Sequence, residues 1–230
     1  FYGMISNLDT QLGKMLSELA KDSLERQTIV IFLGDNGSWR TGHKIDPKDF
    51  DPGLRGGKAS AYQGGVRVPA VFSWPGHFPK GAVVKTLAGL CDVLPTLAGI
   101  CNLDLAGFPA TDGCSLAPIL FKGSQTPGWK DRFVPTHPGR WPSDLTPDKI
   151  PSLGGSIRNQ RYSLVNGAEL YDLESDPGEK NDIAASNPEI RDRLLKAYTD
   201  WWDSIRHDAT QAQPFIFGLK DESPIDLTCM

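Results

Sequence analysis

The sequence lacks any long hydrophobic run. None of its apolar stretches comes near the roughly 20 residues that a membrane-spanning helix requires, so no membrane span is expected. An excess of one charge is also missing: 24 Lys and Arg residues stand against 28 Asp and Glu residues, a net charge of −4. This balance provides no field that would attract a polyanion, and nucleic acid is not an expected partner. With 39% hydrophobic residues, the 230-residue chain can bury a sizeable core.

Cysteine is scarce. The four cysteines are too widely spaced for a CxxC zinc site and too few for a disulfide scaffold, which predicts mainly buried free thiols with at most one disulfide bridge. They are Cys91, Cys101, Cys114 and Cys229. The sequence also has no Gly-x-Ser-x-Gly nucleophile elbow and no glycine-rich phosphate loop before a helix. The chain begins with Phe1 rather than with a methionine or a signal segment, which suggests a piece of a longer protein.

Two segments near the start of the chain predict an α/β layer. Apolar residues recur at steps of three and four from Met4 to Leu19, which predicts an amphipathic helix. The segment from Thr28 to Leu33 is an unalternated run of β-branched and other apolar residues, typical of a strand buried on both faces of a parallel sheet. A helix followed by a buried strand favours the α/β fold class.

The middle of the chain is irregular and then returns to the sheet. Residues 34–65 are rich in glycine and have no periodicity, and loops of this length are usually functional. Two further strands are predicted at Val68–Trp74 and Ala82–Leu87, separated by proline and glycine turns. Asp92 is placed to cap a short helix carrying the apolar residues of 93–98.

The composition changes near residue 125, where prolines become frequent. We therefore predict a main α/β domain over residues 1–125 and a small α+β subdomain over residues 126–230. The expected strands of the subdomain are 156–158, 162–165 and 169–173. Asn166-Gly167 predicts a hairpin turn between the last two strands. A long helix should begin at Asn187-Pro188, a cap followed by proline at the first helical position.

Asp35 and Asn36 directly follow the predicted buried strand. Ligands of open α/β sheets bind beyond the carboxyl ends of the strands, so these side chains occupy a favoured position. A carboxylate beside an amide oxygen offers two hard donors, suited to Ca²⁺ or Mg²⁺. The alternative is an ordinary Asx turn, or a hairpin turn through Asn36-Gly37.

Basic and imidazole side chains supply further candidates. Arg55 and Lys58 flank a Gly-Gly pair, an arrangement that could receive a tetrahedral oxyanion such as sulfate or phosphate, or could be a solvated basic loop. His43 and His137 lie in segments predicted near the binding edge of the main domain. Either could donate a hydrogen bond to substrate or act as a general acid, the alternative being a surface histidine.

These elements together resemble the C-terminal half of a sulfatase of the arylsulfatase branch of the alkaline phosphatase superfamily. The most specific string is residues 54–69, LRGGKASAYQGGVRVP, close to the second signature of that family. The remaining strings that carry the resemblance are YGMI at 2–5, TIVIF at 28–32 leading into DNG at 35–37, WPG at 74–76, DVLPTL at 92–97, RYSLV at 161–165 and ELYDL at 169–173, followed by Asp176, Glu179 and Asn181.

The resemblance implies an alkaline-phosphatase-like mixed or parallel sheet covered by helices, followed by the small subdomain with an antiparallel sheet. It also implies that Asp35 and Asn36 are two ligands of a divalent cation, typically calcium rather than magnesium. Lys58 would contact the sulfate group and act in catalysis, while His43 and His137 would line the substrate pocket. The substrate would be a sulfate ester, and the location periplasmic, secreted or lysosomal.

One departure from the family pattern is important. Sulfatases carry a Cys/Ser-x-Pro-x-Arg motif whose first residue becomes the formylglycine nucleophile, and residues 114–118, CSLAP, do not fit it. The nucleophile is expected in an N-terminal half of the same protein, and this chain alone is expected to be inactive. The alternatives are a phosphodiesterase or phosphonate hydrolase of the same superfamily, and a binding module that has lost the chemistry.

Overall fold

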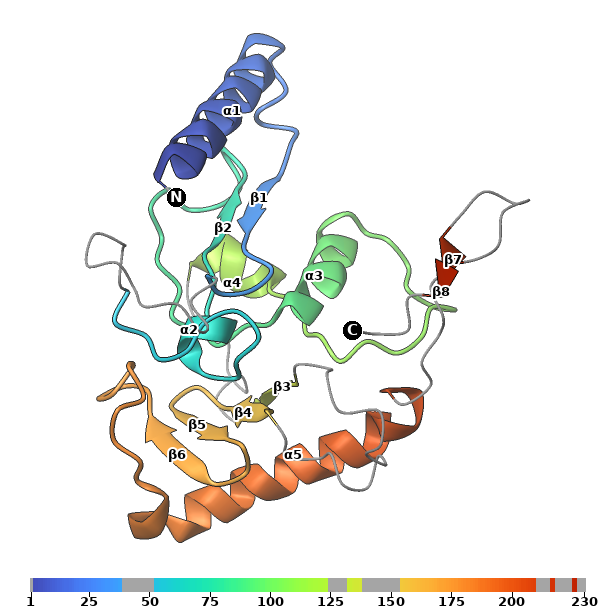
Figure 1. Ribbon diagram of the computed structural model, residues 1–230. Helices are drawn as coiled ribbons and strands as arrows, with labels where there is room; N and C mark the ends of the chain where they lie inside the picture. Colours follow the sequence, from blue (N-terminus) through green and yellow to red (C-terminus); the bar gives the residue numbers. More distant parts are fainter. Residues whose placement is uncertain are drawn as a thin grey trace. The chain divides into compact units, whose positions relative to one another are not determined.

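The computed structural model describes residues 2–38, 52–123, 132–137 and 154–209, together with the two-residue strands β7 (Ile216–Phe217) and β8 (Ile225–Asp226) (Figure 1). The chain separates into two compact units. The first consists of Phe1–Ser38 and Arg67–Val134, and the second of Trp39–Val66 and Pro135–Met230. The predicted division of the chain into domains at residue 125 remains a proposal.

The first unit begins with the predicted amphipathic helix, α1 (Tyr2–Lys21). Its apolar stripe is largely exposed in the structure, with Met4 at 77% and Leu8 at 53% of full exposure. Leu12 and Leu19 are half-buried. The periodicity therefore identified the helix correctly, while the described residues leave most of its apolar face uncovered.

The strand after α1 is β1 (Val30–Leu33), and it pairs with β2 (Ala70–Ser73). The pairing is antiparallel, with Val30 opposite Ser73 and Leu33 opposite Ala70, and β1 is half-buried. The expectation of a parallel partner and of burial on both faces is wrong for this pair. An unalternated apolar run predicts burial, but it carries no information about the direction of a partner 40 residues away along the chain.

Short helices complete the first unit: the 3₁₀ helix η1 (Leu90–Asp92), α3 (Val93–Ile100) and α4 (Ala117–Lys122). The strand predicted at Ala82–Leu87 is absent, and this segment forms no helix or strand. Val83 is 81% exposed, so the apolar alternation there does not correspond to a buried face. Cys91, Cys101 and Cys114 are free as predicted, but exposed rather than buried.

Asp92 has a different role from the predicted cap. It makes no side-chain capping bond to α3. Instead its fully buried carboxylate accepts hydrogen bonds from the backbone N–H groups of Gly89 (2.7 Å) and Cys114 (2.8 Å) and from both terminal nitrogens of Arg132 (2.7 and 2.5 Å). Thr96 continues this link, because its hydroxyl accepts from Leu116 N–H at 2.7 Å and so joins α3 to the start of α4.

The second unit contains a four-stranded sheet in the order β3-β4-β5-β6. The strands are β3 (Val134–Thr136), β4 (Ser156–Arg158), β5 (Tyr162–Val165) and β6 (Glu169–Asp172). β4, β5 and β6 pair antiparallel, as predicted. Asn166 and Gly167 form the predicted turn between β5 and β6 with positive φ angles of 54° and 67°. These are the left-handed conformations that Asn and Gly tolerate best.

The long helix α5 (Pro188–Ala209) lies along this sheet, after the 3₁₀ helix η4 (Ala184–Ser186) (Figure 1). It begins at the proline that the sequence predicted for its first position. Leu194, Tyr198 and Trp202 are at most 3% exposed and form its buried stripe. The sheet contributes Ile157, Leu164, Val165, Leu170 and Tyr171, each at most 1% exposed. This core carries the loop that contains Lys58, which includes the short helix α2 (Gln63–Val66).

Candidate functional site

Asp35 and Asn36 lie two and three residues beyond the end of β1, in the first unit. Asp35 is exposed, and its Oδ1 accepts the backbone N–H of Asn36 at 2.9 Å. The side-chain amide of Asn36 donates to the carbonyl of Gly37 at 3.1 Å, which leaves its oxygen available as an acceptor. A tight hairpin through Asn36-Gly37 is excluded, because β1 pairs with a strand that begins at Ala70.

These two side chains offer hard oxygen atoms of the kind that Ca²⁺ prefers. They do not form a metal site by themselves. Across residues 2–38, 52–123, 132–137 and 154–209, no group of three or more His, Cys, Asp or Glu residues is arranged to hold an ion. The role of Asp35 and Asn36 as ligands of a divalent cation remains a prediction.

Lys58 lies in the second unit, at the corner of a tight turn. The N–H of Ser60 donates to the carbonyl of Gly57 at 3.0 Å, and Ala59 between them has a positive φ of 69°. A positive φ at the third residue is typical of a type II turn, in which Lys58 is the second residue. The hydroxyl of Ser60 accepts from Gly57 N–H at 3.1 Å, so the turn is bonded twice. Lys58 itself is exposed at this corner.

The backbone packs closely behind the turn. Gly64 N–H donates to the carbonyl of Arg55 at 2.6 Å, which closes the loop at its base. A Cβ atom on Gly64 would lie 2.4 Å from the carbonyl oxygen of Gly56, and one on Gly65 would lie 2.1 Å from that of Ser60. Because both clashes are with backbone oxygen, only glycine allows this close approach.

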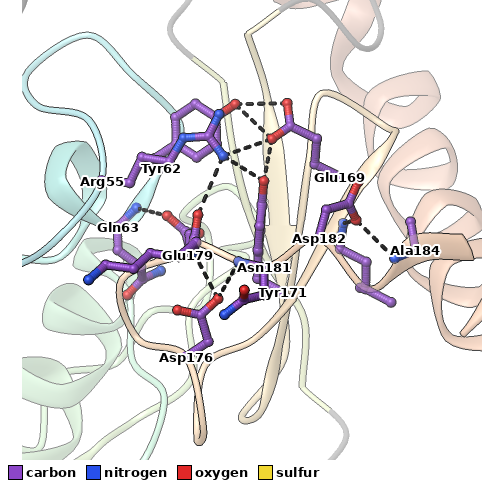
Figure 2. Close-up of polar contacts among 12 residues, drawn as sticks. Arg55, Tyr62, Gln63, Glu169, Tyr171, Asp176, Glu179, Asn181, Asp182 and Ala184 are labelled. Carbon is purple, nitrogen blue, oxygen red and sulfur yellow. Dashed lines mark hydrogen bonds and ion pairs between the residues drawn. The ribbon is translucent and has the colours of Figure 1, made fainter. Parts of the chain in front are cut away.

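The guanidinium of Arg55 is bonded to side chains of the same unit. Its Nη1 donates to Glu169 Oε2 at 2.9 Å and to Tyr171 Oη at 2.6 Å (Figure 2). Its guanidinium also stacks 3.9 Å from the ring centroid of Tyr62. Arg55 therefore fastens the loop to β6. Lys58 lies at the exposed corner of the turn that this loop carries.

Glu169 is the centre of this cluster. Its carboxylate accepts from Arg55, from the hydroxyl of Tyr62 (2.9 and 3.1 Å) and from the hydroxyl of Tyr171. Burial acts to raise the pKa of Glu169, but the hydrogen bonds from Tyr171 and Tyr62 and the charge of Arg55 outweigh it, so the pKa lies below that of an ordinary glutamate. The carboxylate is thus held in its charged form.

A second carboxylate fixes the far side of the loop. Glu179 is completely buried, and its Oε2 accepts the backbone N–H of Gln63 at 2.7 Å. The side-chain oxygen of Gln63 in turn accepts from Arg158 at 3.1 Å. Burial raises the pKa of Glu179, although the hydrogen bonds from Gln63 and Ser163 act against this. The segment around Glu179 is ordered by Asp176, whose carboxylate accepts the N–H groups of Lys180 and Asn181 at 2.8 Å (Figure 2).

Of the two candidate histidines, the structure describes only His137. His137 directly follows β3, is half-buried, and places its ring centroid 4.9 Å from that of Trp202 on α5. His43 lies outside the described residues. The pocket role of both histidines remains a prediction.

Comparison with known proteins identifies the class. Residues 1–103 match the family model described as Sulfatase. The chain is 30% identical over 230 residues to Arylsulfatase A of Homo sapiens, an alignment that covers 87% of this chain and 44% of that protein. It aligns with the crystal structure of Ps i-CgsB at a TM-score of 0.70 and 26% identity, over 87% of this chain and 42% of that one. It aligns with the phosphonate monoester hydrolase of Agrobacterium radiobacter at a TM-score of 0.53 and 25% identity, over 98% of this chain and 44% of that one.

The fold is therefore of the alkaline-phosphatase-like α/β class with a small antiparallel subdomain. Within this class residues 1–103 belong to the sulfatase family, and the chain is similar to the C-terminal portion of those proteins. The chain spans less than half the length of these relatives. None of the helices in the described part of the chain is long and apolar enough to cross a membrane.

Proposed function

We propose that this chain is part of a sulfuric ester hydrolase in which Lys58 contacts the sulfate group of the substrate. The observation that supports this most directly is the division of roles within residues 55–58. Arg55 fastens the loop to Glu169 and Tyr171, and the doubly bonded turn that this loop carries presents Lys58 at an exposed corner. An ammonium group held there would offset negative charge on the ester oxygen as the S–O bond breaks.

Asp35 and Asn36 are proposed as two ligands of a divalent cation, with calcium as the preferred ion. Their oxygen donors and the exposure of Asp35 support this assignment. The bound cation would polarise the sulfuryl group. Calcium takes six to eight oxygens, so most ligands must come from elsewhere in the full-length protein.

The nucleophile is proposed to be a formylglycine in an N-terminal half, because no segment of the 230 residues has the Cys/Ser-x-Pro-x-Arg pattern. On this proposal the present chain supplies the sulfate-contacting lysine and part of the metal site, and has no turnover alone. The 42–44% coverage of the relatives is consistent with such a division.

A second candidate is the hydrolysis of phosphonate or phosphate esters. The similarity to the phosphonate monoester hydrolase supports this alternative. The amide of Asn36, in place of the histidine expected at a two-metal site, favours one cation and therefore a sulfate ester.

The test is the turnover of the full-length protein with an aryl sulfate and, separately, with an aryl phosphonate monoester. Lys58→Ala should lower kcat for the sulfate ester by about 10²–10³, the usual loss for one preorganised donor at the reacting centre. Lys180→Ala, at an exposed lysine of the same unit, is the matched control and should leave kcat unchanged. A Lys58→Ala protein with near wild-type kcat would refute the assignment, and turnover of the phosphonate alone would favour the second candidate.

A further inference from the structure

The turn that carries Lys58 is flanked by side chains that reach a distant part of the sequence. Arg55 lies three residues before Lys58, and Tyr62 lies four residues after it. Both bond the same carboxylate, that of Glu169, which is more than 100 residues away along the chain (Figure 2). The side chain of Glu169 on β6 therefore bonds the loop on both sides of Lys58.

We propose that Glu169 is a positioning residue for Lys58: by bonding Arg55 and Tyr62 together, it sets the direction in which the ammonium group meets the substrate. This inference rests on the proposed function, because it concerns the same lysine. Glu169 makes no contact with substrate in this scheme. Its effect passes through the loop backbone between residues 55 and 62.

The geometry of the cluster suits this role. The carboxylate of Glu169 receives donors from both ends of the loop: Arg55 donates to Oε2 at 2.9 Å, and Tyr62 donates to Oε1 at 2.9 Å and to Oε2 at 3.1 Å. The guanidinium lies over the Tyr62 ring at 3.9 Å, so the two loop side chains also restrain each other. Every group that bonds Glu169 here donates a hydrogen bond. An ionised carboxylate suits this position because its two oxygens only accept hydrogen bonds and can accept several at once.

The carboxylate of Glu169 lies at the edge of the core that holds the unit together. The side chain of Glu169 retains 29% of its exposure, whereas its strand neighbours Leu170 and Tyr171 are at most 1% exposed. The loop adds apolar contacts to this core through Ala61 and Tyr62, which pack with Val165, Tyr171 and Leu173. Loss of the carboxylate charge should therefore loosen the loop while the sheet and α5 remain folded.

The experiment is a double-mutant cycle in the full-length protein, with an aryl sulfate as substrate. Glu169→Gln preserves shape but removes one acceptor and the charge. It should lower kcat about tenfold, since a displacement of about 1 Å at a reacting centre can cost up to about 10²-fold. KM should change less than kcat. In a Lys58→Ala background the same change should lower kcat less than about twofold, because the group that it positions is gone.

Two further variants keep the test interpretable. Tyr62→Phe removes only one hydroxyl from the cluster and should show the same dependence on Lys58 with a smaller loss of kcat. Asp172→Asn is the matched control on the same strand: Asp172 pairs with exposed Arg161, away from the loop, and its removal should leave kcat unchanged. Thermal unfolding of each variant establishes that the assays are run on folded protein.

The outcomes separate the two proposals. If Lys58→Ala is slow and Glu169→Gln lowers kcat by the same factor with and without Lys58, the positioning role is refuted and the proposed function stands. An unchanged kcat in Glu169→Gln also refutes the positioning role of Glu169. If Lys58→Ala itself retains wild-type turnover, the contact of Lys58 with the sulfate group is refuted, and so is the positioning role that rests on it.

Discussion

Substitution of Gly65 by alanine should damage the site through the backbone. In the structure, a Cβ atom at this position would lie 2.1 Å from the carbonyl oxygen of Ser60 and 2.4 Å from that of Gly57. Ordinary contact begins at 3.4 Å, and 3.4 minus 2.1 leaves 1.3 Å of displacement to be found. Both obstructing atoms belong to the turn around Lys58, so this turn must move.

The expected cost follows from that displacement. Forcing one extra carbon into a closely packed region costs about 1–3 kcal/mol of unfolding free energy, and backbone obstruction places Gly65→Ala at the upper end. A shift of about 1 Å at Lys58 should also lower kcat by about 10²-fold. The unfolding free energy is measured by urea denaturation of the full-length protein, and kcat with an aryl sulfate.

Gly99→Ala provides the matched control. Gly99 is exposed in α3, and its Cβ would meet only the hydroxyl of Ser115 at 3.4 Å. Replacing a helical glycine by alanine there should stabilise the protein by about 0.5–1 kcal/mol and leave kcat unchanged. If Gly65→Ala were as stable and as active as Gly99→Ala, the close packing behind the Lys58 turn would not exist in solution.

Two further predictions concern the first unit. Asp92→Ala should lower the unfolding free energy by about 3–5 kcal/mol, because it removes the carboxylate that pairs with the largely buried charge of Arg132. Urea denaturation measures this, and a loss below about 1 kcal/mol, the usual value for an exposed ion pair, would contradict it. Hydrogen bonds from Arg132, Gly89 and Cys114 overcome the effect of burial and hold the pKa of Asp92 below its usual value. The stabilisation that the Asp92 carboxylate gives the folded state is therefore complete above about pH 4, the pKa range of an unfolded aspartate. It is lost as the pH falls through the lower pKa of the folded state. Acid titration of Asp92→Ala should not show this loss of unfolding free energy. Asp35→Ala should abolish the rise in melting temperature that calcium gives the full-length protein, whereas Asp104→Ala, at another exposed loop aspartate, should retain it; equal calcium stabilisation in both variants would remove Asp35 from the ligand set.

The sequence was most informative where local chemistry determines structure. The repeat of apolar residues predicted α1, and Asn187-Pro188 predicted the start of α5. Asn166-Gly167 predicted the hairpin, because few other residues accept two successive positive φ angles. These signals act within a few residues and need no knowledge of the rest of the fold.

It was least informative where the partner lies far along the chain. The direction of β2 against β1 and the absence of a strand at Ala82–Leu87 both depend on long-range pairing. The spacing of Arg55 and Lys58 around two glycines left two interpretations open, a shared oxyanion site and a solvated basic loop. Nothing nearby in the sequence indicates that Glu169 and Tyr171 neutralise and hold this arginine.

The distance along the chain between the Lys58 loop and the groups that secure it has a consequence for synthesis. Gln63 and Glu179 are 116 residues apart, and at about 5–20 residues per second a ribosome needs roughly 6–23 s to make that length. For most of that interval, until residue 169 is reached, the lysine has already been translated while both carboxylates that fasten its loop are still to be made. The loop is therefore among the last parts of this chain to acquire its native contacts, and a message truncated before residue 169 yields a protein with the lysine present but unsupported.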